Sequence, residues 1–113
     1  MIFQPEHIEK NKTGIKTETR RRWDKGMAYV GRYYPCMRDY RHKHDPEDGW
    51  ILVNKVFRQR LGDMSQEDAK AEGGYTLAEY IKVWIRINGG WNANEIVTVV
   101  KYKWVRYKIA VNS

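Results

Sequence analysis

Residues 65–90 have the sequence SQEDAKAEGGYTLAEYIKVWIRINGG, in which two segments each begin with a helix-capping pattern and end in a Gly-Gly pair. Ser65 and Asp68 have the spacing of a capping box, with Asp in place of the usual Glu or Gln. Thr76 and Glu79 form a complete box. The second segment also carries an apolar stripe at helical spacing, formed by Leu77, Tyr80, Ile81, Trp84 and Ile85. These patterns predict two helices, each ended by glycine.

Strand-forming sequence lies on both sides of these helices. Residues 50–61 are rich in apolar and β-branched residues, and their broken alternation predicts a strand with a bulge near Asn54. Residues 96–109 predict one long strand or a bent pair of strands. Residues 27–34 predict a further strand that Pro35 ends.

The N-terminal part predicts a short strand, a short helix and an extended segment. Ile2 begins the strand, Pro5 stands where a first helical turn tolerates proline, and Gly14 is a plausible helix stop. Thr17 and Thr19 then favour an extended backbone. Short strands with helices between them predict an α+β fold, and we expect a small barrel.

Length and composition narrow the class of protein. The chain has 113 residues, 42% of them hydrophobic and 13% aromatic, which predicts one folded domain over residues 1–113 rather than a disordered tail. Cys36 is the single cysteine, which excludes an internal disulfide framework and a zinc site built on several thiolates. No apolar run approaches the roughly 20 residues that span a bilayer, so we expect a soluble cytoplasmic protein with no membrane partner.

Positive charge is concentrated in the first half of the chain. The formal net charge is +7, and residues 10–60 contain fourteen Lys and Arg against six Asp and Glu. Residues 61–95 contain three Lys and Arg against six acids. This imbalance predicts one positive face and an anionic partner, although a basic protein without such a site has the same composition.

Three segments, in this order, resemble the ASCH domain, a branch of the PUA-like superfamily of small β-barrels that handle RNA and modified nucleosides. They are Gly14-Ile15-Lys16-Thr17-Glu18-Thr19-Arg20-Arg21, similar to the family's Gly-x-Lys-x-x-x-x-Arg signature; residues 57–65 running into 68–73; and residues 76–80 with Trp84, Trp91-Asn92 and the valine-rich strand 96–100. The resemblance implies a single PUA-like β-barrel of about five to six strands with two to three short helices.

Within the family, the chain looks closest to the small bacterial amidohydrolases that deacylate N4-acetylcytidine. Many members have Glu where this chain has Thr19, and Thr19 matches that subset. The resemblance implies a catalytic set of Lys16 as base, Thr19 as nucleophile and Glu79 as acid or base. A lysine can act as a base at neutral pH only if burial or neighbouring charge lowers its pKa.

Each of these residues also has a simpler explanation. Glu79 completes the Thr76 capping box, Lys16 could be solvated near a helix end, and Thr19 could be an ordinary strand residue. Positions 16 and 19 point to opposite faces of a regular strand. The catalytic interpretation therefore requires Lys16 to lie in the turn before the strand, or a bulge between the two.

The basic and aromatic residues are candidates for ligand binding. Arg20 and Arg22 either contact phosphate or line a solvated edge, whereas Arg21 is expected to point inward toward an acid such as Glu72 or Glu79. A second group either stacks on a base or belongs to the core: Arg32, Tyr33 and Trp91.

No metal or cofactor is expected, because one thiol and the loop histidines match no known ligand spacing: Cys36, His42 and His44 with Asp45. Two functions remain open. The first is binding of RNA or a modified pyrimidine nucleoside through a basic cleft, by a monomer. The alternative is an amidohydrolase that deacylates N4-acetylcytidine, and a small nuclease ranks third.

Overall fold

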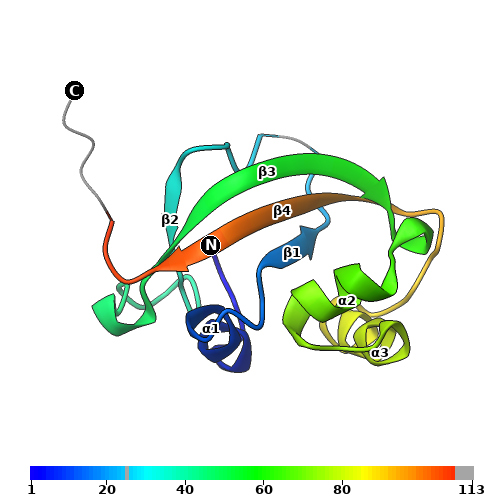
Figure 1. The fold of residues 1–113 in the computed structure, drawn as a ribbon, viewed down its shortest axis with the longest axis horizontal. Helices are drawn as coiled ribbons and strands as arrows, with labels where there is room; N and C mark the ends of the chain where they lie inside the picture. The colour runs from blue at the N-terminus through cyan, green and yellow to red at the C-terminus, as the bar shows by residue number, and fades with distance from the viewer. Residues whose placement is uncertain (25, 109–113) are drawn as a thin grey trace.

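The computed structural model describes residues 1–24 and 26–108. Its elements in chain order are α1 (Pro5–Lys12), β1 (Glu18–Arg21), β2 (Tyr33–Pro35), η1 (Pro46–Asp48), β3 (Trp50–Arg60), η2 (Leu61–Asp63), α2 (Gln66–Gly73), α3 (Leu77–Asn88) and β4 (Ile96–Val105). The strands form one antiparallel sheet in the order β1-β4-β3-β2, and β3 and β4 arch over the three helices (Figure 1). The α+β prediction is confirmed.

The predicted helix boundaries are confirmed by their caps. Ser65 accepts a hydrogen bond from the Asp68 amide and its own amide donates to the Asp68 carboxylate, so α2 has a reciprocal capping box. Thr76 and Glu79 form the same arrangement at α3. Gly14 has φ 76° just beyond α1, a left-handed conformation that suits glycine.

The two long strands follow the sequence pattern. The β3–β4 register shifts between Val53 and Lys55, which confirms the bulge predicted near Asn54. β4 is a single continuous strand rather than a bent pair. The predicted end of this strand, Ile109, lies outside the described residues.

The predicted N-terminal strand was wrong, and the strand predicted over residues 27–34 is shortened to β2, Tyr33–Pro35. Ile2 makes only an isolated bridge to Met37. Residues 27–32 form a loop, because Gly31 has φ 83° and the Arg32 amide donates to the Tyr29 carbonyl, which closes a turn. The described residues therefore contain four strands in a half-barrel, not five to six.

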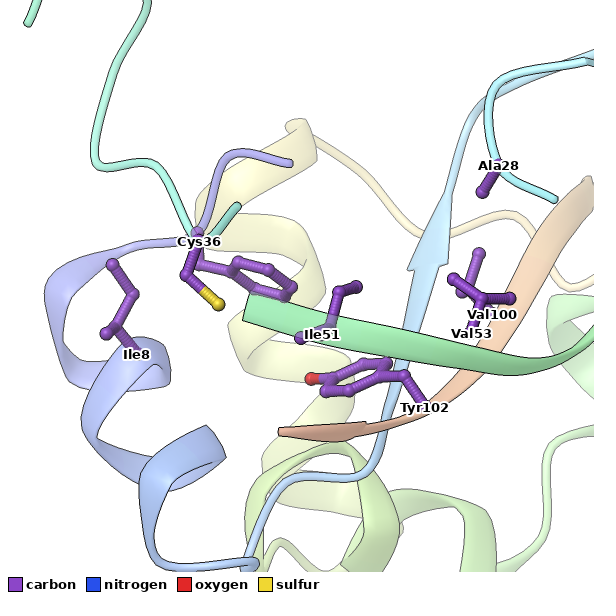
Figure 2. Packing of buried hydrophobic residues seen from close by; sticks show 8 residues of the cluster. Ile8, Ala28, Cys36, Ile51, Val53, Val100 and Tyr102 are labelled. Carbon is purple, nitrogen blue, oxygen red and sulfur yellow. The ribbon is translucent and has the colours of Figure 1, made fainter. Parts of the chain in front are cut away.

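Two buried clusters pack against the sheet. The first joins α1 to the sheet and contains Phe3, Ile8, Ala28, Cys36, Ile51, Val53, Val100 and Tyr102 (Figure 2). The second joins α2 and α3 to the end of the sheet and contains Leu61, Met64, Ala69, Tyr80, Trp84 and Val97. β1 is an edge strand that lies between α1 and the pair α2 and α3 (Figure 1). Its residues Thr19, Arg20 and Arg21 line the candidate site described next.

Candidate functional site

A cavity of about 400 Å³ lies where the two buried clusters meet. Its walls come from the N-terminal segment and α1, from β1 and its flanks, and from α2 and α3. The polar side chains among its lining residues include Gln4, His7, Lys16, Thr19, Arg20, Arg21, Arg22, Glu72 and Asn88. Aromatic walls are supplied by Phe3, Trp23, Tyr80 and Trp84.

Lys16 lies in the segment between α1 and β1, as the catalytic interpretation requires, and it is only 3% exposed. Its Nζ donates hydrogen bonds to the Glu72 carbonyl oxygen at 2.8 Å and to Glu72 Oε1 at 3.0 Å. Burial lowers the pKa of Lys16, while the charge of Glu72 and its hydrogen bond oppose that shift. The interpretation of Lys16 as a solvated helix-end residue was therefore wrong.

Thr19 lies in β1 and is also buried. Its Oγ1 accepts a hydrogen bond from Arg21 Nε at 3.0 Å, which leaves the hydroxyl hydrogen free for another acceptor. Arg21 is fixed in turn, because Nη2 donates to the Ile2 carbonyl at 2.7 Å and the guanidinium lies 5.0 Å from the centre of the Phe3 ring. The Thr19 hydroxyl and the Arg21 guanidinium are thus hydrogen-bonded to each other, and both residues line the cavity.

Arg20 and Arg22 are engaged within the molecule. The Arg20 side chain is fully buried, and its Nη1 donates to Glu18 Oε1 at 2.6 Å and to Glu72 Oε2 at 2.8 Å. Arg22, at the surface, donates to both carboxylate oxygens of Glu95 and to a carbonyl at the end of α3. Arg20, rather than Arg21, is the arginine that pairs with Glu72.

Glu79 lies on the exposed surface and is not among the residues that line the cavity. Its Oε1 accepts a hydrogen bond from the Thr76 amide at 2.9 Å, and hydrogen bonds from Thr76 hold the pKa of this carboxyl below its usual range. The structure brings Lys16 and Thr19 to one cavity and leaves Glu79 outside it.

Glu72 and His7 line the cavity, although the sequence suggested Glu72 only as a possible partner of Arg21 and did not suggest His7. Glu72 occupies the last turn of α2, where the helix dipole disfavours an acid, and this placement was a usable signal that the side chain has another partner. His7 Nε2 lies 3.0 Å from Tyr75 Oη. Burial, together with the nearby charge of Lys16, lowers the pKa of His7 to about 3 and keeps its ring neutral.

The remaining predicted binding residues lie away from the cavity. The Arg32 guanidinium is 5.1 Å from the centre of the Tyr29 ring on the exposed 27–32 loop. Tyr33 is half-buried in β2. Trp91 is half-buried and packs edge-on against Trp84, with ring centres 6.3 Å apart.

Within residues 1–24 and 26–108, no group of three or more His, Cys, Asp or Glu side chains is arranged to hold a metal ion. Cys36 is buried, which raises the pKa of its thiol to about 11. The described helices are all too short or too polar to cross a bilayer.

No protein-family model and no curated protein matches the sequence, whereas solved structures do match the fold. An ASCH domain from Lactobacillus crispatus JV V101 aligns with a TM-score of 0.69 and 15% identity, over 86% of this chain and 69% of that one. A protein from Enterococcus faecalis V583, described by the family model DUF984, aligns with a TM-score of 0.57 and 17% identity, over 83% of this chain and 63% of that one. The match over 86% of the chain at a TM-score of 0.69 shows that this chain has the fold of an ASCH domain.

Proposed function

We propose that the cavity binds a modified pyrimidine nucleoside and hydrolyses the amide of an N4-acylated cytosine. One observation carries the proposal: Lys16 is buried against Glu72 on the wall of a cavity that Thr19 also lines. The volume of about 400 Å³ is in the range of small-molecule sites, and the aromatic walls suit a flat pyrimidine ring.

The proposed reaction has two halves. In the first, Thr19 Oγ1 attacks the acyl carbonyl carbon while the neutral amine of Lys16 takes the hydroxyl proton. The bond between the carbonyl carbon and N4 breaks, and the Lys16 ammonium returns its proton to the leaving nitrogen. In the second half, water attacks the acyl ester of Thr19, which releases the carboxylic acid and restores the hydroxyl.

Two features support this assignment of roles. Burial lowers the pKa of Lys16, as a lysine base requires. Arg21 donates to Thr19 Oγ1, so its charge would stabilise the oxygen as the proton leaves. We propose that Glu72, which accepts a hydrogen bond from Lys16, is the carboxylate of the site in place of Glu79 and orients the Lys16 amine.

The test is to incubate the purified protein with N4-acetylcytidine and to follow cytidine by chromatography. We expect turnover by the wild type, none by Lys16→Met, and none by Thr19→Val, which keeps the β-branched shape. The matched control is Thr17→Val, because the Thr17 side chain is exposed and outside the cavity lining. Full activity in Thr19→Val would contradict the nucleophile assignment, and an inactive wild type would contradict the hydrolase.

A second candidate function, RNA binding, is favoured by a group of lysines on the sheet. Lys55 and Lys101 stand directly opposite each other in the β3–β4 register, an arrangement that like charges destabilise. Their Nζ atoms lie 5.1 and 5.9 Å from the centre of the Phe57 ring. Lys103 follows two residues later on the same face, opposite Leu52, which is paired in turn with Tyr33. Cations interleaved with rings are typical of single-stranded nucleic acid sites.

This candidate is tested with labelled single-stranded RNA at several salt concentrations. If Lys55 and Lys103 each contact a phosphate, the double variant Lys55→Gln/Lys103→Gln should make the negative slope of log K against log salt less steep by about 1.4. A control that removes two exposed helix charges, Lys70→Gln/Lys82→Gln, should leave the slope near its wild-type value. An equal change in both double variants would contradict a specific RNA surface on the sheet.

A further inference from the structure

Four buried charged side chains form a chain of ion pairs at the cavity, and three of them line it. Lys16 Nζ lies 3.0 Å from Glu72 Oε1, and Arg20 Nη1 lies 2.8 Å from Glu72 Oε2. Arg20 Nη1 also lies 2.6 Å from Glu18 Oε1. All four side chains are 3% exposed or less. Two cations therefore share one buried carboxylate, and two carboxylates share one buried guanidinium.

Arg20 is held rigidly in this cluster. Besides its contacts to the two glutamates, Nη2 donates to Gln59 Oε1 at 2.8 Å and lies 3.5 Å from Asp68 Oδ2. The guanidinium is thus held from three elements: its own strand β1, β3 through Gln59, and α2 through Asp68. Because Glu72 is on α2, Arg20 ties the helix that carries this carboxylate to the strand that carries Thr19.

We propose that Arg20 is a positioning residue of the cavity, which fixes the Glu72 carboxylate and balances its charge while Lys16 is neutral. This inference rests on the proposed function, in which Lys16 gives up a proton. With Lys16 as its only partner, Glu72 would become an unpaired buried anion at that moment, which is strongly unfavourable. Arg20 retains its proton at all relevant pH values, so Glu72 keeps one cation throughout.

Two charged neighbours act on the pKa of Lys16 in opposite directions. The negative charge of Glu18 favours the ammonium form, whereas the positive charge of Arg21 disfavours it. Other titratable or charged groups face the cluster from α1, α2, α3 and β4, and they are His7, Asp68, Tyr80, Lys101 and Tyr102. These groups are unchanged when Arg20 or Glu18 is substituted, so the effect of each substitution can be compared directly.

The experiment measures the midpoint of Lys16 deprotonation in two ways. The first is the pH dependence of kcat/KM for N4-acetylcytidine, which should rise as Lys16 loses its proton. The second needs no activity: the chemical shift of the Lys16 ε-carbon in protein labelled with ¹³C-lysine, assigned by its loss in Lys16→Met. If the wild type does not turn over N4-acetylcytidine, the proposed function fails and the NMR midpoint still tests the role of Arg20.

Opposite shifts are expected from the two substitutions. Arg20→Gln should raise the Lys16 midpoint by about one pH unit or more, and Glu18→Gln should lower it. Arg20→Lys should restore much of the midpoint, since it keeps the charge, while losing rate because one ammonium cannot hold both carboxylates in the same geometry. If Arg20→Gln does not fold, the double variant Glu18→Gln/Arg20→Gln is used, because it removes one positive and one negative charge and leaves the net charge of the cluster unchanged. Its Lys16 midpoint is compared with that of Glu18→Gln. Midpoints that stay at the wild-type value while the rate falls would overturn the proposal.

Discussion

Glu72→Gln removes a buried charge, and Glu79→Gln makes the same chemical change at an exposed capping residue. Comparing the two variants therefore isolates the effect of burial on stability. Glu72 is 2% exposed and contacts two buried cations, Lys16 and Arg20. Removal of one partner from a buried ion pair costs about 3–5 kcal/mol. At about 4 °C per kcal/mol for a domain of this size, we expect Glu72→Gln to lower Tm by at least about 12 °C.

Glu79→Gln should change the free energy of unfolding far less than Glu72→Gln does, because Glu79 is exposed. Glutamine is itself accepted at this position of a capping box, so what is lost is the interaction of the carboxylate with the helix dipole. The two variants also differ in their pH dependence. Without Glu72, the pKa of Lys16 falls further, so the folded state of that variant binds fewer protons than the unfolded state. The stability of Glu72→Gln should therefore increase as the pH rises toward about 10.4, the pKa of lysine in the unfolded chain.

The assay is thermal unfolding followed by circular dichroism for wild type, Glu72→Gln and Glu79→Gln, at about pH 7 and about pH 9. The difference between wild type and Glu72→Gln should be large at the lower pH and smaller at the higher one. Equal losses in the two variants, or a difference that does not shrink with rising pH, would refute the buried-cluster reasoning.

Two further predictions concern folding stability. The pKa of His7 is lowered to about 3, so the folded protein keeps this ring neutral at pH values where the unfolded chain, with a pKa of about 6.5, takes up a proton. The free energy of unfolding should therefore decrease as the pH is lowered from about 6.5 to about 3, by up to about 1.4 kcal/mol per pH unit. Urea unfolding of His7→Gln should show a shallower decline, and parallel curves would contradict the assignment. Gly49 has φ 68°, and a Cβ there would lie 2.5 Å from the Trp104 indole nitrogen, so Gly49→Ala should cost about 2–4 kcal/mol. Gly31→Ala, with φ 83° and open space around the new Cβ, should cost only about 1–2 kcal/mol, and an equal loss in both would show that the Trp104 contact is unimportant.

The sequence predicted those features that short-range rules determine. The capping boxes at Ser65 and Thr76 each need four consecutive residues, and both formed as expected. The bulge near Asn54 followed from the alternation of neighbouring residues. The 27–32 segment failed because its strand-like composition is overridden by one turn at Gly31.

The candidate site was predictable only in part, because its contacts span long stretches of chain. Lys16 and Glu72 are 56 residues apart, and no spacing rule connects them. Glu79 had a local pattern and was therefore the more visible carboxylate. Arg20 belongs to a run of three arginines, which is typical of a solvated surface, and only the tertiary structure shows that Glu18 and Glu72 bury it.

The strand order has a consequence for how the chain is made. β4 is the last of the described strands along the chain, yet it lies between β1 and β3 at the centre of the sheet (Figure 1). During synthesis, β1 leaves the ribosome before β4 and finds its one neighbour among the described strands when β4 has emerged. Until then β1, which carries Thr19, Arg20 and Arg21, lacks this ladder of hydrogen bonds. Pairing with β4 is thus the step that fixes in place the strand from which three residues line the cavity.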